Sequence, residues 1–419
     1  MLPRKLLLLS YSFPPSNIIG AVRPYQIANF FKQKGWDVYV VACRDPGIVE
    51  NYKVDISEFN ITNVVASPIV AWIGNGQPAT TGFWSKAKNK LSRVLRFGLR
   101  AISFPEHYVF MKKGFVCSSL RLAESNRFDL VVSSALPFTM HVAAREVAKK
   151  LSLPWVADNR DLWAVSPYRK EGKGRKVFDT WYEARILRDA KVVTGVSQAM
   201  VDYYRNNLGL RQSSLVMNGY SLASSGMEPV EYVPSLPAGR DRLKIVYGGG
   251  LYGGLRDPSP LLDAIAEDPD LKDQTRIDFY GSEPDCVAKL QLRYPDCGLY
   301  CHGRLTKNEI AEVYKSSDIL LVVLGRGAFE GGVMTGKFFE YLAFCKPVLA
   351  IAPEGSELAR VVSDHKLGLA TSDAKKIASY LRSILRGSAS PISGYPKELT
   401  INNQLERLYR AISDSGDVR

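Results

Sequence analysis

Hydrophobic and polar positions alternate between two patterns along the whole chain. Short runs of aliphatic residues, such as 5–10 (KLLLLS) and 318–324 (DILLVVL), alternate with longer stretches of helical periodicity. This alternation is typical of a parallel sheet covered by helices. It predicts strands at 5–10, 37–42, 129–133, 154–157 and 191–194, and again at 243–248, 276–280, 318–324 and 347–352. It predicts helices at 21–34, 139–151, 258–267, 306–316, 336–345 and 375–386.

The predicted strands form two series, separated by a segment with the composition of a linker. Residues 219–242 (GYSLASSGMEPVEYVPSLPAGRDR) are rich in Gly, Pro and Ser and have little periodicity. We therefore expect an α/β protein of two doubly wound, Rossmann-like domains that face a cleft, with ligands bound beyond the carboxyl ends of the strands. The expected parts are a first domain at 1–220, a linker at 221–242, a second domain at 243–395 and a terminal segment at 396–419. That last segment is expected to be either an ordinary terminal helix or one that returns to the first domain.

The stretch GGVMTGKF (331–338) differs from a P-loop at one position. A P-loop ends in a Ser or Thr that binds magnesium, whereas this stretch ends in a phenylalanine, and it does not directly follow a strand. Thr335 is instead expected to cap a helix whose first turn contains Gly336 and Lys337, an arrangement that binds phosphate. Glu340, one turn further, is placed to bind a pair of ribose hydroxyls. The alternative is an ordinary capped helix with a solvated Lys337–Glu340 salt bridge.

Two other glycine-rich loops follow the first strand of each series. Gly20 precedes the helix after the first strand, where the missing side chain would let a ligand approach the backbone. In the second series, YGGGLYGGLRD places five glycines and Arg256 after the strand. Neither loop has the dinucleotide-binding fingerprint. Each taken singly is a tight turn, but their equivalent positions favour a binding role.

Three residues are candidates for acid–base or orienting roles. Asp158 and Asp161 belong to DNRDLW (158–163), which follows a predicted strand and so lies at the edge where ligands bind. Asp161 is expected either to orient a sugar or to cap a following helix. His141 lies in a predicted first helical turn near the same edge, and is either catalytic or structural.

The order of the motifs resembles the retaining glycosyltransferases of family 4, which have the GT-B architecture and include bacterial surface-polysaccharide enzymes. The matching stretches are FPP…G (13–20), DNRDLW, VSQAM (196–200), MNGY (217–220), FYGS (279–282), HGRLTKNEIAEVYKSSDILL and TGKFFEYLAFCKPVLA. The resemblance implies a nucleotide-sugar donor held by the second domain and an acceptor held by the first. It makes Glu340 the ribose-binding residue, Arg256 and Lys337 the cations for the leaving diphosphate, and Gly20 a contact for the donor phosphates.

Two positions depart from the pattern of that family. Gly332 stands where many members have the first of two glutamates, and Gly250 stands where an arginine is usual, leaving Arg256 to supply the charge. Negative charge develops on the leaving diphosphate, and prearranged cations and N–H dipoles stabilise it. We therefore expect a retaining hexosyl transfer that needs no metal and no cofactor. The rivals are a sugar-nucleotide epimerase of the same architecture and a non-catalytic membrane-associated partner.

Composition places the chain among globular proteins with an unusual basic charge. Hydrophobic residues make up 46% and charged residues 23%. Six scattered cysteines without a C-x-x-C pair suggest reduced thiols and a cytoplasmic protein. The net charge is +13, of which residues 86–113 supply +7, eight Lys or Arg against one Glu.

The basic segment is amphipathic, with Leu91, Val94 and Leu95 on one helical face and Arg93 and Arg96 opposite. Such a helix binds an anionic membrane surface, or else packs on its own domain. No run interleaves aromatic and basic residues for nucleic acid. We expect a peripheral enzyme at the inner face of the cell membrane that transfers a sugar to a lipid-linked or polymeric glycan.

Overall fold

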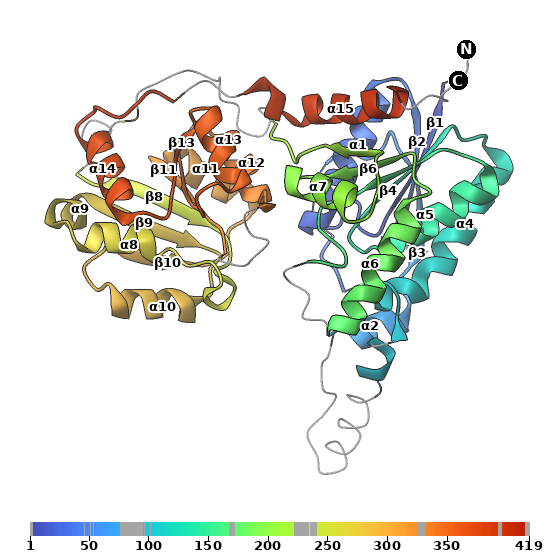
Figure 1. Ribbon diagram of the computed structural model, residues 1–419, viewed down its shortest axis with the longest axis horizontal. Helices are drawn as coiled ribbons and strands as arrows, with labels where there is room; N and C mark the ends of the chain where they lie inside the picture. The colour runs from blue at the N-terminus through green and yellow to red at the C-terminus, as the bar shows by residue number, and fades with distance from the viewer. Residues whose placement is uncertain are drawn as a thin grey trace, which may run out of the picture. The chain divides into compact units, whose positions relative to one another are not determined.

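The structure is a computed structural model in which the chain forms two compact units (Figure 1). The first unit comprises Met1–Val196, Met200–Val216 and Leu405–Arg419, and the second comprises Ser197–Ala199 and Met217–Gln404. The structure describes residues 3–45, 47–50, 52, 54–75, 95, 97–100, 102–166, 172–221, 234, 241–325, 332–392 and 396–414.

The first unit contains a seven-stranded parallel sheet in the order β3-β2-β1-β4-β5-β6-β7. Its strands are β1 (Lys5–Ser10), β2 (Asp37–Arg44), β3 (Asn60–Val65), β4 (Leu130–Ser134), β5 (Trp155–Asp158), β6 (Val192–Gly195) and β7 (Ser213–Leu215). Its helices are η1 (Ile19–Ala21), α1 (Val22–Gln33), α2 (Pro68–Asn75), η2 (His107–Met111), α4 (Lys112–Ser125), α5 (Thr139–Leu151), α6 (Lys173–Leu187) and α7 (Gln198–Asn206).

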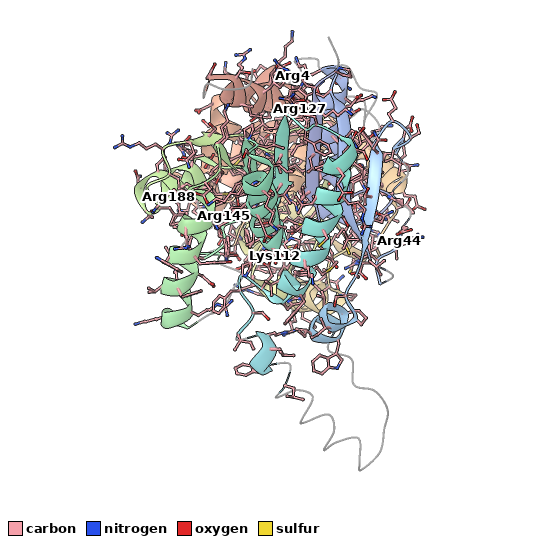
Figure 2. The ribbon with its side chains drawn as sticks, turned by 90° about the vertical axis from the view of Figure 1, so that its right-hand side faces the viewer. Arg4, Arg44, Lys112, Arg127, Arg145 and Arg188 are labelled. Atoms are coloured by element: carbon pink, nitrogen blue, oxygen red, sulfur yellow. The ribbon has the colours of Figure 1, made fainter. Side chains whose placement is uncertain are left out.

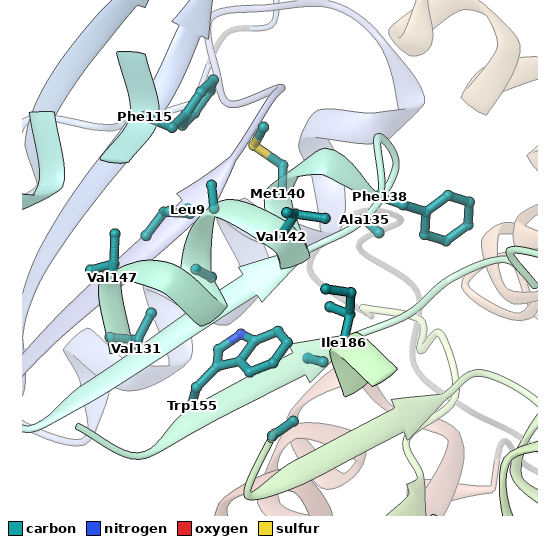
Figure 3. Packing of buried hydrophobic residues seen from close by; sticks show 14 of the residues in the cluster. Leu9, Phe115, Val131, Ala135, Phe138, Met140, Val142, Val147, Trp155 and Ile186 are labelled. Atoms are coloured by element: carbon teal, nitrogen blue, oxygen red, sulfur yellow. The ribbon is translucent and has the colours of Figure 1, made fainter. Parts of the chain in front are cut away.

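Helix α5 lies over the middle of this sheet and builds much of the core. Met140 and Val147 of α5 pack with Leu9 of β1 and Val131 of β4, and all four side chains are fully buried (Figure 3). Trp155 of β5, also buried, extends the same cluster. Because the strands are apolar on both faces, the sheet is covered by helices and its carboxyl edge is left to loops.

The second unit contains a six-stranded parallel sheet in the order β10-β9-β8-β11-β12-β13. Its strands are β8 (Leu243–Gly248), β9 (Thr275–Tyr280), β10 (Leu299–His302), β11 (Ile319–Val323), β12 (Val348–Ile351) and β13 (Gly368–Ala370). Its helices are η4 (Tyr252–Gly254), α8 (Ser259–Ala266), α9 (Pro269–Gln274), α10 (Pro284–Arg293), α11 (Lys307–Ser316), α12 (Gly336–Leu342), α13 (Glu357–Asp364), α14 (Ala374–Leu385) and η6 (Lys397–Leu399).

Several helices of the second unit begin at a residue whose side chain caps the first turn. Asp268, Ser356 and Asp373 each accept backbone N–H bonds at the start of α9, α13 and α14. Thr306 and Glu309 form a reciprocal capping box at α11. These caps satisfy N–H groups that have no partner within the helix, which fixes where each helix leaves its loop.

The predicted α/β class with two doubly wound sheets is confirmed, and all nine predicted strands are present. The pattern missed β3, β7, β10 and β13, which are the four edge strands of the two sheets. Edge strands are exposed on one side: β3 has one buried residue, β10 has one, and β13 has none. They therefore lack the continuous apolar runs that identified the central strands.

The chain segments around residues 220 and 400 are bonded to each other within the second unit. The N–H of Tyr220 donates to Leu399 and the N–H of Ile401 donates to Tyr220, at 3.1 and 2.9 Å. The buried Gln404 accepts from the N–H of Met217 at 2.8 Å. These bonds join the segment that enters the second unit to the segment that leaves it.

The last helix, α15 (Ile401–Asp414), has its residues from Leu405 onward in the first unit. Tyr409 packs its ring against Phe30 and Phe31 of α1. Lys34 pairs with Glu406 at the end of α1. The terminal residues thus complete the covering of α1 in the first unit.

Gly219 is a position where backbone segments approach too closely for a side chain. A Cβ there would lie 2.4 Å from the Cα and N of Ile401. We predict that Gly219→Ala lowers the free energy of unfolding by about 1–3 kcal/mol, because one of the two segments must move. Chemical denaturation measures this change. Gly174→Ala, at an open helical position of α6, is the matched control and should be neutral or slightly stabilising. Equal stabilities of the two variants would contradict the prediction.

Candidate functional site

A buried ion pair organises the carboxyl edge of the first sheet. Arg23 of α1 binds Asp158, at the end of β5, with its Nε and Nη2 atoms at 2.8–3.0 Å. Ser134 of β4 and Thr194 of β6 donate to the same carboxylate at 2.9 and 2.8 Å. Arg23 also donates to the carbonyl of Val216 at 2.9 Å. Asp158 and Arg23 together therefore join the ends of β4, β5 and β6, the segment at Val216 and helix α1.

The same contacts decide what Asp158 does. Burial by itself raises the pKa of Asp158, but the charge of Arg23 and the hydrogen bonds from Arg23, Thr194 and Ser134 outweigh it and hold the pKa below its usual value. Its side chain is fully buried and engaged on both oxygens. This geometry argues against the predicted catalytic role and makes Asp158 a positioning residue.

Arg160 connects the loops that lie above this ion pair. Its Nη1 donates to the carbonyl of Gly20 at 3.1 Å, and its Nε donates to the carbonyl of Ala135 at 2.6 Å. Burial lowers the pKa of Arg160. A Cβ added at Gly20, which belongs to η1, would lie within 4 Å of Ser12 and Arg160, at ordinary contact distances. The candidate loop of Gly20 is thus held by the DNRDLW segment, while its contact with a phosphate stays a prediction.

Asp161 is a partly exposed carboxylate at this edge. Residues 159–166 form turns and loop, and the next helix among the described residues, α6, begins at Lys173 with Gly172 as its cap, which argues against the alternative role of Asp161 as a helix cap. Burial raises the pKa of Asp161, and the positive charge of Arg160 opposes that rise. Of the predicted acidic residues in this loop, Asp161 is the one left available to a ligand.

His141 lies in the first turn of α5, as predicted, but inside the protein. Its Nδ1 pairs with Ser133 Oγ at 2.8 Å and its Nε2 pairs with Asn159 Oδ1 at 3.0 Å. Trp155 Nε1 donates to the same Ser133 oxygen. Burial lowers the pKa of His141 to about 4, so the imidazole is neutral at physiological pH. A fully buried ring with both nitrogens engaged supports the structural role of His141 and argues against the predicted catalytic one.

Glu183 of α6 is a buried acid that is hydrogen-bonded to the residue after the DNRDLW segment. Its Oε2 accepts from the N–H of Ala164 at 3.2 Å and from the hydroxyl of Tyr203 at 3.2 Å. Burial raises the pKa of Glu183 to about 8, and the neighbouring Asp179 adds to the rise. The acid is therefore largely protonated at neutral pH, and it links α6 and α7 to the loop that carries Asp161.

The glycine-rich loop after β8 forms the corresponding edge of the second unit. Glu283, beyond β9, accepts from the N–H of Leu251 at 2.8 Å, and Ser282 donates to the carbonyl of Gly249. Tyr247 donates to the carbonyl of Gly250 at 2.8 Å. Gly249 has φ 155°, a conformation that side chains rarely adopt. The loop is thus fixed from its own strand and from the next one.

Arg256 follows this loop and lies beside the end of β11. Residues 256 and 325 form an isolated antiparallel bridge, which places Arg256 next to the strand that precedes α12. Its guanidinium lies over the ring of Tyr252, 4.7 Å from the centroid. The structure therefore brings Arg256 and the start of the α12 segment to one edge of the second sheet.

Helix α12 begins as predicted, with Thr335 as its cap. The side chain of Thr335 accepts from the N–H of Lys337 at 3.4 Å. Lys337 Nζ and Glu340 Oε2 are 2.9 Å apart, so the two predicted donor-binding side chains form a half-exposed ion pair with each other. No atom of the described residues lies within 4 Å of the Cβ position of Gly336, which leaves space on this side of the helix start as far as those residues are concerned.

Three residues of these edges could not be identified from the sequence. Tyr341 is fully buried and accepts from the N–H of Gly248 at 2.8 Å, which ties α12 to the glycine-rich loop. Glu283 and Glu183 support loops far from them in sequence. A glutamate or a tyrosine in a helix or turn gives no signal of such a partner, because the contact depends on the fold.

Among the residues described, no three His, Cys, Asp or Glu side chains gather as a metal site would require. No described helix is long and apolar enough to cross a membrane. The predictions of a metal-independent and cofactor-free reaction stay predictions.

Comparison with known structures defines the class of fold. The chain superposes over 99% of its length on sucrose-phosphate synthase from Thermosynechococcus elongatus, with a TM-score of 0.65 and 16% identity, covering all of that chain. It also superposes over 98% on the apo form of the lipopolysaccharide outer core galactosyltransferase WaaB, with a TM-score of 0.60 and 12% identity, again covering all of that chain. The predicted GT-B fold of two Rossmann-like domains is confirmed.

The sequence itself matches a family over the first part of the chain. Residues 20–220 match the Glycosyl transferase 4-like domain. A stretch of 128 residues is 28% identical to the Pseudomonas aeruginosa protein named "Probable glycosyltransferase WbjE", covering 30% of this chain and 32% of that protein. The chain thus matches about a third of the length of this relative. These matches show a likeness to glycosyltransferases over the first part of the chain.

Glu183 makes stability depend on pH. Its pKa is raised from 4.5 to about 8, so the folded state keeps a proton that the unfolded state releases, and folding stability falls as pH rises from about 5 to 8. We predict that Glu183→Gln removes this pH dependence. The free energy of unfolding of the variant should rise relative to that of wild type by up to about 1.4 kcal/mol for each pH unit in that range. Urea unfolding at pH 5, 6.5 and 8 measures it.

The other titratable groups around Glu183 are Tyr203 and Tyr204 of α7, and Asp161 and Asp179. Burial raises the pKa of both tyrosines, which keeps them neutral across this range. Asp179 is paired with Arg175 at 3.1 Å. Glu124→Gln, on α4, is the control. Parallel pH profiles for wild type and Glu183→Gln would contradict the prediction.

Proposed function

We propose that this protein is a metal-independent, retaining glycosyltransferase that moves a hexosyl group from a nucleotide-sugar to a lipid-linked or polymeric glycan in bacterial surface-polysaccharide synthesis. The observation that carries the proposal is the edge of the second sheet. The fixed glycine loop, Arg256 and the Lys337–Glu340 pair lie together there. The family match over 20–220 supports the same activity.

The chemistry follows from the charges at that edge. Breaking the bond between sugar and diphosphate builds negative charge on the leaving oxygen, and cations already in place stabilise it. Lys337 and Arg256 supply those cations, and the open N–H groups at Gly336 add dipoles of the same sign. Glu340 accepts hydrogen bonds from ribose hydroxyls while its partner Lys337 turns toward the phosphates.

In the first unit, Asp161 is the residue proposed to orient a sugar. Asp158 and Arg23 hold the backbone from which Asp161 projects, and Glu183 supports the other end of the same loop. The raised pKa of Asp161 suits a group that exchanges hydrogen bonds with sugar hydroxyls rather than one locked in an ion pair. Retention of configuration is proposed from the family type.

The first test is calorimetric titration with a panel of nucleoside diphosphates, without metal. We expect one of them to bind wild type, and Glu340→Ala to weaken that binding about 10- to 100-fold, the loss expected for hydrogen bonds to a charged group. The matched control is Glu354→Ala, which breaks an exposed pair with Lys376 in the same unit and should bind as wild type does. Failure of every nucleotide to bind would overturn the transferase proposal in favour of a non-catalytic partner.

We further propose that the first unit docks on an anionic membrane. The basic segment predicted for this role, 86–113, is described only at 95, 97–100 and 102–113; residues 86–94, 96 and 101 lie outside the described part. Phe97 and Ile102 are 75% and 70% exposed. Arg100 donates to the carbonyl of Ile73 at 2.6 Å, which fixes this stretch beside α2.

Helix α6 continues the same surface. The ring of Phe178 lies 4.4 Å from that of Phe104, and Arg175 donates to the carbonyl of Ser103 at 2.9 Å. In Figure 1, α2 and α6 reach the same end of the first unit. We call this surface the aromatic end; its exposed members are Trp72, Phe97, Ile102, Val177, Phe178 and Trp181.

The charges of the aromatic end favour an anionic partner. The exposed charges of its described residues are Arg100, Lys173, Lys176 and Arg185, while both acids of α6 are buried. Elsewhere on this unit, Lys112 pairs with Glu146 and Arg145 pairs with Asp189; Figure 2 labels the two basic residues. Aromatic side chains beside exposed basic side chains suit a lipid–water interface.

Cosedimentation with vesicles of phosphatidylcholine and phosphatidylglycerol tests this docking. Each aromatic side chain that leaves water contributes about 1.5–3 kcal/mol, so the double variant Trp72→Ser, Trp181→Ser should bind at least about tenfold more weakly. The control is Leu292→Ser, at a residue 84% exposed on α10 of the second unit. Equal binding by the double variant and the control would contradict the proposal, as would equal binding to neutral vesicles.

A further inference from the structure

A small cavity lies at the carboxyl ends of β1, β2 and β3, apart from the loop that carries Asp161. Its volume is about 200 Å³. The lining mixes apolar and polar side chains, among them Tyr11, Phe13, Ser16, Asp45, Glu50 and Asn63. All lie in the first unit, on the loops that follow β1 and β2 and on the edge strand β3.

The walls of the cavity are held in place by backbone bonds between the two loops. The N–H of Asn17 donates to Val49 at 2.8 Å and the N–H of Tyr52 donates to Pro15 at 3.0 Å. Ser16 and Glu50 form an isolated antiparallel bridge between them. The cavity therefore exists before any ligand binds, and ordering it costs little on binding.

The hydroxyl of Ser16 lacks a hydrogen-bond partner among the described residues, although the side chain is only 7% exposed. A buried hydroxyl without a partner is unfavourable by about 1–3 kcal/mol. Natural proteins retain such groups where a ligand satisfies them. Ser16 lines the cavity, so a polar ligand there would remove this penalty.

Other polar groups of the lining are fixed in direction. Asp45 accepts from the Tyr11 hydroxyl and from the N–H of Gly47, each at 2.9 Å, which locks its carboxylate. Phe13 packs at the rim with Tyr25 and Phe59, at ring-centroid distances of 6.3 and 5.9 Å. Fixed carboxylates beside hydroxyls and an aromatic surface match the alternating C–H and O–H groups of a sugar ring.

We propose that this cavity binds one pyranose ring of the acceptor saccharide, an inference that rests on the proposed transferase function. Its volume equals roughly seven water molecules at about 30 Å³ each, which suits a single sugar ring and is too small for a whole nucleotide-sugar. Arg44, the cation of the lining, faces Glu50 at 3.8 Å. The two acids of the lining, Asp45 and Glu50, outnumber this cation, which disfavours a phosphate and is compatible with a neutral sugar ring.

The test is saturation-transfer NMR on the full chain with the methyl glycosides of glucose, galactose, mannose, rhamnose and N-acetylglucosamine. We expect at least one to bind wild type. Ser16→Ala should weaken its binding about 2- to 10-fold, as for one lost hydrogen bond. Asn63→Trp, a substitution on the exposed edge strand that blocks the cavity, should abolish it. The matched control is Ser119→Ala, which removes another buried, unpartnered hydroxyl, on α4, and should bind as wild type does.

Two results would overturn the inference: no glycoside binds wild type, or the same glycoside binds Asn63→Trp equally well. Nucleoside diphosphates titrated into the same samples separate this inference from the transferase proposal. Nucleotide binding without glycoside binding would contradict the acceptor-cavity inference and leave the transferase proposal standing. Glycoside binding without nucleotide binding would remove the transferase proposal and leave a saccharide-binding cavity.

Discussion

The carboxyl edge of the first sheet depends on one buried ion pair. Arg23 and Asp158 are 3% and 0% exposed, and the interior stabilises their charges only because Ser134, Thr194 and the carbonyl of Val216 complete the hydrogen bonds. Removing one partner of such a pair leaves an uncompensated charge at a cost of about 3–5 kcal/mol. The loop that carries Asp161 starts from β5, one of the elements that the pair joins.

In the second unit, the described contacts that fix the carboxyl edge of the sheet are hydrogen bonds and not a buried ion pair. Its glycine-rich loop contains few side chains, and Glu283 and Tyr341 hold its N–H groups from neighbouring elements. The charged residues, Lys337 and Glu340, remain half exposed and form an ion pair with each other. A rigid backbone beside exposed charged side chains is the arrangement expected for a site where Lys337 and Glu340 separate to bind a phosphate-bearing ligand.

Sequence and structure agree wherever burial is uniform along an element. The central strands were predicted because they contain runs of buried apolar residues, whereas the four edge strands, exposed on one side, were missed. The Thr335 cap was predicted because a cap is local. The role of His141 was open for the opposite reason, since its burial depends on Ser133 and Asn159, which come from two different strand ends.

The sequence by itself determined the class of fold, the central strands and the Thr335 cap, because periodicity and capping are local properties; the ligand-binding loops and the phosphate contacts stay predictions. Tertiary structure alone decided the surroundings of the two acids: Asp158 is buried by an arginine 135 positions away, whereas Asp161, three residues later, is partly exposed beside Arg160. It also brought α2 and α6, the helices that contain Trp72, Phe178 and Trp181, toward one end of the first unit. Exposure and charge pairing depend on contacts between distant segments, and no local pattern encodes them.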